Sequence, residues 1–83
     1  MNIIILPVAK KGLKKLPKEA AEIILKKLCL IKDNPLRYME RLKGSHLWKL
    51  RVGEYRVVMM VDTGGRIINV IKVGHRKSIY KNL

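Results

Sequence analysis

The sequence predicts an α+β domain in which an N-terminal helical hairpin packs on one face of a small, mainly antiparallel four-stranded sheet. Three observations lead to this prediction. A short β-branched segment opens the chain, two stretches with apolar residues at helical spacing follow, and the second half changes to a two-residue alternation. Because 83 residues leave room for one core, we expect a single domain over residues 1–83 with the order β-α-α-β-β-β.

The first half of the chain contains the expected strand and helices. Residues 2–6 form a β-branched strand that ends at Pro7. A short helix is expected over residues 8–16, and a second helix begins at Pro17, where a missing N–H is tolerated, and stops before Pro35. The spacing assigns two apolar helix faces: Val8, Ala9, Leu13 and Leu16 in the first helix, and Ala21, Ile24, Leu25, Leu28 and Ile31 in the second.

The second half is expected to form a meander. Strands are predicted over residues 47–52, 55–62 and 66–73, with glycine-containing turns between them. We interpret residues 36–44 as a connector and residues 74–83 as a polar tail.

The first of these turns assigns the two faces of the sheet. A two-residue II′ loop at Gly53 and Glu54 pairs Arg51 with Arg56 and places Lys49 on the same face, since directly opposed residues share a face. Two opposed arginines repel each other unless an anion lies between them, so this face predicts a bound phosphate; the alternative is that both side chains extend into water. The other face is apolar and carries Trp48, Leu50, Val52, Tyr55, Val57, Met59 and Val61.

The net charge narrows the class of partner. The chain has 19 Lys and Arg against 6 Asp and Glu, a formal net charge of +13, spread over both halves. A charge of this size predicts a polyanionic partner, either nucleic acid, an anionic membrane surface or an acidic protein, the alternative being a merely solvated lysine surface. No apolar stretch approaches the roughly 20 residues of a membrane span, and we expect a reduced, cytoplasmic globular domain.

Metal and cofactor chemistry is not indicated. His46, His75 and Cys29 do not have a metal-ligand spacing, so we expect neither a metal nor a cofactor, and we interpret Cys29 as a core thiol. The remaining candidates are cationic or aromatic: Lys49, Arg51, Arg56, His75, Arg76, Lys77 and Tyr80. Cleavage of RNA by its own 2′-hydroxyl requires such groups, namely a base, positive charge on the phosphate and an acid for the leaving oxygen.

Several segments together resemble the RelE/ParE toxin superfamily, and most of all its RelE branch. They are residues 48–57, residues 70–76 followed by Tyr80, the Lys-Lys-Leu-Pro of residues 14–17 and the Arg-Leu-Lys-Gly of residues 41–44. The resemblance covers essentially the whole chain. It implies a toxin that enters the ribosomal A site and cleaves mRNA there without a metal, by attack of the 2′-hydroxyl. It also implies three partners: an acidic RelB-like antitoxin, the ribosome with its ribosomal RNA, and mRNA.

The resemblance also implies residue roles. Lys49 matches the second lysine of the family's active-site pair, Arg56 the arginine that stabilises the transition state, Arg76 the arginine proposed to protonate the leaving oxygen, and Tyr80 the tyrosine that orients the nucleotide. Nearby basic residues are expected to bind RNA: Arg51, His75, Lys77 and Lys43. The helix lysines, Lys10, Lys11, Lys14, Lys15, Lys26 and Lys27, are expected to supply docking charge for ribosomal RNA.

One position departs from the family pattern. Leu47 stands where the family has the first lysine of the pair, which leaves Lys49 alone or gives His75 the role of substitute base or acid. Two other functions stay open at this point. One is a ParE-like inhibitor of DNA gyrase, and the other is a basic RNA-binding domain without catalysis, such as a degenerate toxin.

Overall fold

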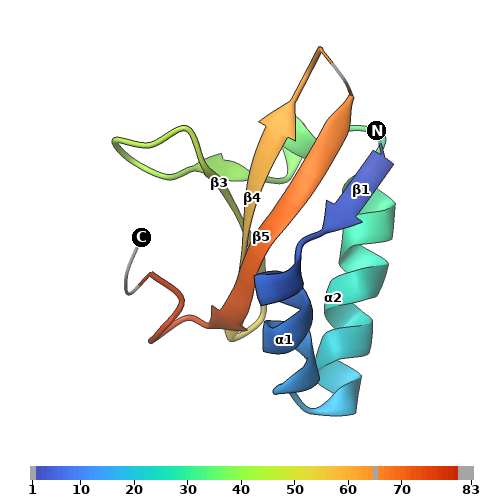
Figure 1. The fold of residues 1–83 in the computed structure, drawn as a ribbon, viewed down its shortest axis with the longest axis vertical. Coiled ribbons are helices and arrows are strands. Elements are labelled where there is room, and N and C mark those ends of the chain that lie inside the picture. The colour runs from blue at the N-terminus through green and yellow to red at the C-terminus, as the bar shows by residue number, and fades with distance from the viewer. Residues whose placement is uncertain (1, 65, 81–83) are drawn as a thin grey trace.

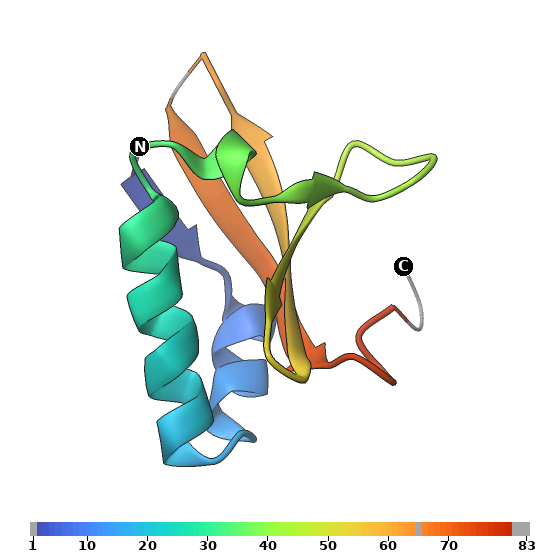
Figure 2. The same cartoon turned by 180° about the vertical axis from the view of Figure 1, so that it is seen from behind.

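The computed structural model describes residues 2–64 and 66–80, and within them the predicted α+β architecture is confirmed. The elements, in chain order, are β1 (Asn2–Ile5), α1 (Pro7–Lys14), α2 (Lys18–Ile31), the short 3-10 helix η1 (Pro35–Arg37), β2 (Glu40–Arg41), β3 (Trp48–Val52), β4 (Tyr55–Asp62) and β5 (Ile67–His75). Both helices lie on the same side of the sheet, and the opposite side is not covered by a helix (Figures 1 and 2). We call these the helix face and the open face.

The sheet has five strands in the order β1-β5-β4-β3-β2, where four were expected. The added strand, β2, lies in the segment interpreted as a connector: Glu40 and Arg41 pair antiparallel with Lys49 and Trp48. A two-residue strand has too little alternation to be recognised in the sequence. The N-terminal strand β1 pairs parallel with β5, and the other neighbours are antiparallel.

The helix face carries the core. Its cluster of buried residues combines α1 and α2 with alternate residues of the strands and with Met39, which precedes β2: Ala9, Ile24, Leu28, Ile31, Met39, Leu50, Val52, Val57, Met59, Ile68, Val70 and Val73. Trp48, Tyr55 and Val61 are partly buried against it, so the predicted apolar face is confirmed. The predicted turn is confirmed too, because β3 and β4 pair in the expected register and Gly53 has φ 58°, as a II′ turn requires at its first central position.

Three residues predicted to face the core are exposed: Val8, Leu25 and Cys29. In α1 the buried side runs through Ala9 and Gly12, so Val8 points away from the sheet. The buried residues of α2 recur every three or four positions and form a narrow stripe along the helix. Leu25 and Cys29 lie next to this stripe and face solvent.

The strand β5 contains an irregularity that the sequence did not indicate. Val58 pairs with Lys72 but the next residue, Met59, pairs with Val70, so Ile71 is an extra residue in β5. The bulge shifts the alternation of β5 by one residue. Val73 faces the core on one side of the bulge, and Val70 and Ile68 face it on the other side. Lys72 and Gly74 therefore lie on the open face, the latter opposite Arg56.

The segment after β5 folds onto the open face and is not the polar tail that was expected. Ile79 is 1% exposed, and its Cδ1 atom lies 3.3 Å from the position of a Cβ on Gly74. Val58 of the same face is also fully buried, although it is not part of the helix-face cluster. Residues 76–80 thus cover part of the open face (Figures 1 and 2). The last three residues of the expected tail, and residue 65 of the expected turn, lie outside the described part of the chain. Among the described helices, none is long and apolar enough to cross a membrane.

Candidate functional site

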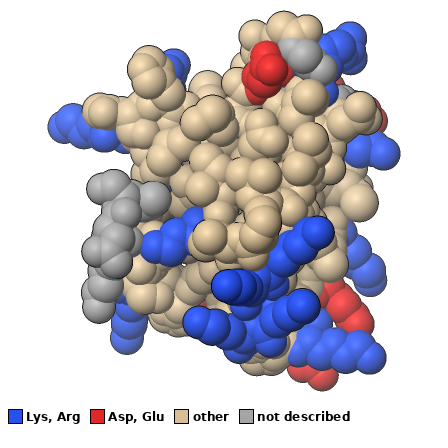
Figure 3. Space-filling view, in the orientation of Figure 1, with Lys and Arg blue, Asp and Glu red and all other residues tan. Residues whose placement is uncertain are grey.

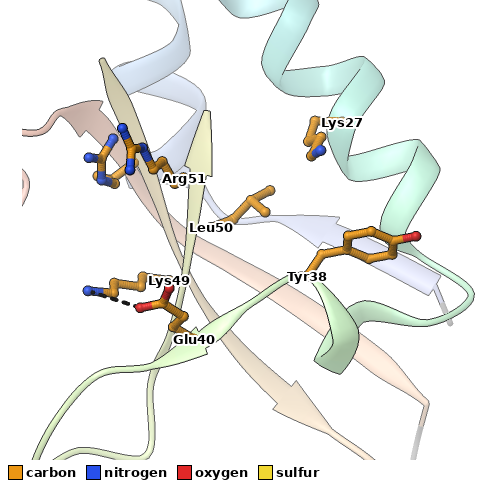
Figure 4. A pocket seen from close by; sticks show the side chains of 7 residues that line it. Lys27, Tyr38, Glu40, Lys49, Leu50 and Arg51 are labelled. Carbon is orange, nitrogen blue, oxygen red and sulfur yellow. Dashed lines mark ion pairs between the residues drawn. The ribbon is translucent and has the colours of Figure 1, made fainter. Parts of the chain in front are cut away.

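A hollow of about 230 Å³ lies along the edge of β3 and contains three of the predicted site residues. Lys49 and Arg51 come from β3, and Arg56 comes from β4, directly opposite Arg51. The residues that line the hollow are Lys27, Tyr38, Glu40, Lys49, Leu50, Arg51 and Arg56. Figure 4 shows Lys49 and Arg51 projecting to one side of β3, with Tyr38 and Lys27 on the side of α2 and Leu50 between them. The expectation that the three cations share one face is confirmed by the register.

The backbone of the β3–β4 turn positions Arg56. One guanidinium nitrogen, Nη1, donates hydrogen bonds to the carbonyl oxygens of Gly53 and Tyr55, both at 2.8 Å. These two bonds use one side of the guanidinium. Since the group carries five N–H donors in a planar fork, donors are left over for an anion. Arg51 is exposed opposite it, so the pair forms two halves of a site that an oxyanion can occupy.

Lys49 is paired with a carboxylate. Its Nζ lies 3.6 Å from Glu40 Oε2, and the two side chains belong to paired residues of β3 and β2. This contact was not predicted, because it depends on the short strand β2. It places a carboxylate at the rim of the cationic hollow (Figure 4).

The same turn also holds the end of β5. The Arg76 backbone N–H donates to the carbonyl oxygen of Glu54 at 2.9 Å, and the Arg76 Nε lies 2.9 Å from Glu54 Oε2. His75 Nε2 lies 3.9 Å from the same carboxylate oxygen, and the His75 ring meets the Tyr55 ring edge-on at 5.9 Å. The turn therefore orients Arg56 through its carbonyl groups and Arg76 through Glu54.

The remaining predicted residues lie around this centre or away from it. Tyr80 follows the buried Ile79 on the open face and is partly exposed. Lys77 is exposed in the same segment, and its backbone N–H donates to His75 Nδ1 at 3.2 Å. Lys43 lies in the projecting loop between β2 and β3, where it lines a separate hollow. The structure thus brings Lys49, Arg51 and Arg56 into one hollow and leaves Lys43 outside it.

Four residues of the site were missed: Tyr38, Lys27, Glu40 and Glu54. Tyr38, interpreted as a packing residue, is 49% exposed and lies in the hollow, with the Lys27 Nζ 5.7 Å from its ring centroid. No local sequence signal places η1 beside β3, so neither Tyr38 nor Lys27 was predictable as a site residue. Glu54 was predicted only as a turn residue, because its partner Arg76 is positioned by the bulge in β5.

The arrangement can bind and polarise a phosphodiester. Two guanidinium groups and two ammonium groups, those of Lys27 and Lys49, border a single hollow, and arginine forks match phosphate oxygens in a bidentate geometry. Charge that develops on the phosphate oxygens during a displacement would be stabilised by these cations.

Comparison with known proteins places the chain among toxins. Residues 3–80 match the model of the family described as the ParE toxin of the type II toxin–antitoxin system parDE. A curated relative from Methanocaldococcus jannaschii, named as the candidate toxin RelE1, is 34% identical over 77 residues, which cover 87% of this chain and 86% of the relative.

Solved structures agree with the observed fold. A chain of the RelBE2 toxin–antitoxin complex from Mycobacterium tuberculosis has a TM-score of 0.82 over 90% of this chain and 96% of its own, and its 22% identity supports a likeness of fold alone. The isolated RelE toxin of E. coli is 26% identical, with a TM-score of 0.76 over 89% of this chain and 82% of its own. A chain of the RelB–RelE complex from Methanococcus jannaschii is 27% identical, with a TM-score of 0.68 over 93% of this chain and 94% of its own.

Proposed function

The chain belongs to the RelE/ParE superfamily of toxins of toxin–antitoxin systems, and from that premise we propose that it is a ribosome-dependent mRNA endonuclease that inhibits translation. The observation that carries the proposal is the opposed pair Arg51 and Arg56, which lines one hollow together with Lys49. Such a set suits a scissile phosphate in the ribosomal A site.

The reaction needs no group outside the RNA as nucleophile. The 2′-oxygen attacks the adjacent phosphorus, the bond to the 5′-oxygen breaks, and a cyclic phosphate and a 5′-hydroxyl result. One proton leaves the 2′-hydroxyl and one reaches the 5′-oxygen, so the protein supplies a base, an acid and positive charge. Arg51 and Arg56 provide positive charge for the oxygens that become more negative in the transition state.

The proton transfers are assigned to residues on the two sides of this pair. Lys49 accepts the 2′-proton or, because Leu47 stands where the family has the other lysine, His75 does so as a substitute, and Arg76 donates a proton to the leaving 5′-oxygen. Tyr80 orients the nucleotide by stacking, which every base permits through its π-face. The support for Arg76 is its fixed position, since Glu54 contacts both its backbone and its guanidinium.

The partners follow from the same proposal. An acidic RelB-like antitoxin would restrain the toxin, since the relatives from M. tuberculosis and M. jannaschii were solved as complexes with their antitoxins and the net charge here is +13. In the cytoplasm the toxin would bind the ribosome and its A-site mRNA. Lys43, Lys77 and the helix lysines would then contact RNA.

The test is expression of the full chain in a translation extract, with mRNA ends mapped by primer extension. Wild-type toxin is expected to arrest translation and to cut mRNA within codons. The double variant R56A/R76A is expected to lose both effects, whereas K18A/R66A, which removes two exposed cations elsewhere, keeps them. Toxicity that persists in R56A/R76A would overturn the proposal.

A gyrase-directed activity is the second candidate, because the matched family model is that of a ParE toxin. It predicts inhibition of DNA supercoiling by purified gyrase and DNA-damage signalling without mRNA cleavage. The non-catalytic alternative predicts salt-dependent RNA binding with intact mRNA on ribosomes. One extract experiment combined with one supercoiling assay separates the three.

A further inference from the structure

A second cationic hollow, of about 390 Å³, lies where α1, β5 and the C-terminal segment meet. Three lysines border it: Lys11 and Lys15 from α1 and its end, and Lys72 from the open face of β5. Ser78 and His75 complete its polar lining. We call it the lysine groove. In Figure 3 a cluster of Lys and Arg side chains covers the region of α1 and the end of β5.

The backbone holds these lysines close together. A Cβ on Gly12 would lie 2.4 Å from the carbonyl oxygen of Val73, so α1 approaches β5 in backbone contact at this point. Lys11 and Lys15 lie about one helical turn apart, on either side of Gly12 in the sequence, and like charges at this spacing repel each other. Among the described residues that line the groove there is no Asp or Glu.

The groove is next to the candidate active site. Gly74 lines the groove, Arg56 lines the hollow at β3, and the two residues are directly paired across β5 and β4. Neighbouring strands lie about 4.8 Å apart, and one strand, β4, separates β3, which borders the hollow, from β5, which borders the groove. Ile79 packs over Gly74, which lines the groove and pairs with Arg56, so an RNA strand that follows this pair from one hollow to the other would pass over the C-terminal segment.

We propose that the lysine groove binds backbone phosphates of the same RNA strand whose scissile phosphate occupies the hollow of Lys49, Arg51 and Arg56. This deepens the proposed function, on which it rests, by assigning Lys11 and Lys15 to the substrate strand instead of to general docking on ribosomal RNA. The groove supplies ammonium groups and the hydroxyl of Ser78 as donors, and phosphodiester oxygens are the matching acceptors.

The test compares two variants of the full chain that differ in the face of α1 they change. K11Q/K15Q removes two groove lysines. K10Q/K14Q removes two exposed lysines of the same helix at the same spacing, which do not line the groove, and serves as the control. The probe is a short fluorescent RNA with 2′-O-methyl groups, which cannot be cut by its own 2′-oxygen, so binding is measured whether or not the toxin is a nuclease.

The groove predicts a difference between the two variants. K11Q/K15Q should weaken RNA binding about tenfold or more at low salt and lower the slope of log K against log salt by roughly 1.4, since each phosphate contact of a single strand contributes about 0.7. K10Q/K14Q should weaken binding of this short RNA less than about threefold, because Lys10 and Lys14 are assigned to ribosomal RNA and not to the substrate strand. Equal losses in both variants would overturn the proposal and identify the groove as ordinary solvated charge.

Ribosome sedimentation provides the second arm. If K11Q/K15Q binds the short RNA as wild type does but sediments less with ribosomes that carry no mRNA, the groove contacts ribosomal RNA and the assignment to the substrate strand is wrong. Failure of the proposed function looks different: the wild-type toxin would leave mRNA intact in the extract, while the binding difference between the two variants would remain.

Discussion

The two faces of the sheet are built on different principles. The helix face is filled by apolar side chains of α1, α2 and alternate strand positions. The open face carries Lys49, Arg51 and Arg56, and its buried apolar residues, Val58 and Ile79, come together only because the C-terminal segment folds across it. A pattern repeated along the chain determines the first face. The second face combines a local turn, which pairs Arg51 with Arg56, with contacts between distant segments. Stability should therefore depend mainly on the helix face and activity on the open face.

The helix face should show the largest effect on stability. Leu28→Ala on α2 removes a side chain that is 2% exposed, and truncations of this kind cost about 2–5 kcal/mol of unfolding free energy. Urea unfolding followed by circular dichroism measures the loss. Leu30→Ala makes the same change on the same helix at a position that is 76% exposed, and it should change stability by no more than about 0.5 kcal/mol. Equal losses in the two variants would contradict the assignment of the core.

The open face should show the converse. Arg56→Ala removes a guanidinium that we place on the scissile phosphate, and loss of one such donor lowers the rate about 100- to 1000-fold. Its unfolding free energy should change by less than about 1 kcal/mol, because the side chain is only partly buried and its partners are carbonyl groups near the surface. Single-turnover cleavage on programmed ribosomes gives the rate. A rate within threefold of wild type would remove Arg56 from the site.

The contact between α1 and β5 lies next to both faces of the sheet, because Val73 faces the helices and its neighbours Lys72 and Gly74 lie on the open face. Gly12→Ala puts a methyl group 2.4 Å from the Val73 carbonyl oxygen, and overpacking of this kind costs about 1–3 kcal/mol. Gly64→Ala is the matched control, because its nearest neighbour, an oxygen of Asp62, would be 3.5 Å away. Thermal unfolding compares the two variants. A Gly12→Ala protein as stable as wild type would show that α1 can move away from β5 without cost.

The smallest effect on stability is expected at Glu54. Glu54→Gln removes the ion pair with Arg76, and both side chains are more than half exposed, so the loss should be about 0.2–1 kcal/mol or less. The cleavage rate should fall by more than this loss of free energy would account for, because the Arg76 guanidinium would lose its ion pair with the Glu54 carboxylate. In an Arg76→Ala background the same substitution should have no further effect on the cleavage rate. An additive loss in the double variant would show that Glu54 acts independently of Arg76.

The sequence was sufficient where a local rule applied. The II′ turn at Gly53 fixed the pairing of β3 with β4, so Arg51 and Arg56 could be placed opposite each other and the apolar face could be named in advance. The helix of residues 8–16 was predicted within two residues of α1 at its C-terminal end. These features depend on residues that are close in the sequence, and burial of the apolar face stabilises the same arrangement.

The sequence was insufficient where distant segments meet. Because of the bulge at Ile71, the sequence alone did not show which residues of β5 lie on the open face. It therefore did not show that Gly74 lies under Ile79. The strand β2 was too short to recognise, so the pairing of Glu40 with Lys49 was missed. The exposed positions of Val8, Leu25 and Cys29 followed from how α1 and α2 dock, which apolar spacing alone does not specify.

The most direct test of the central claim is to analyse the ends of an mRNA after incubation with the full chain, with and without ribosomes. If the open face is a ribosome-dependent endonuclease site, new ends carrying a cyclic phosphate and a 5′-hydroxyl should appear within codons when ribosomes are present, and they should be absent without ribosomes. Intact mRNA on translating ribosomes, or the same cuts in RNA without ribosomes, would contradict the account.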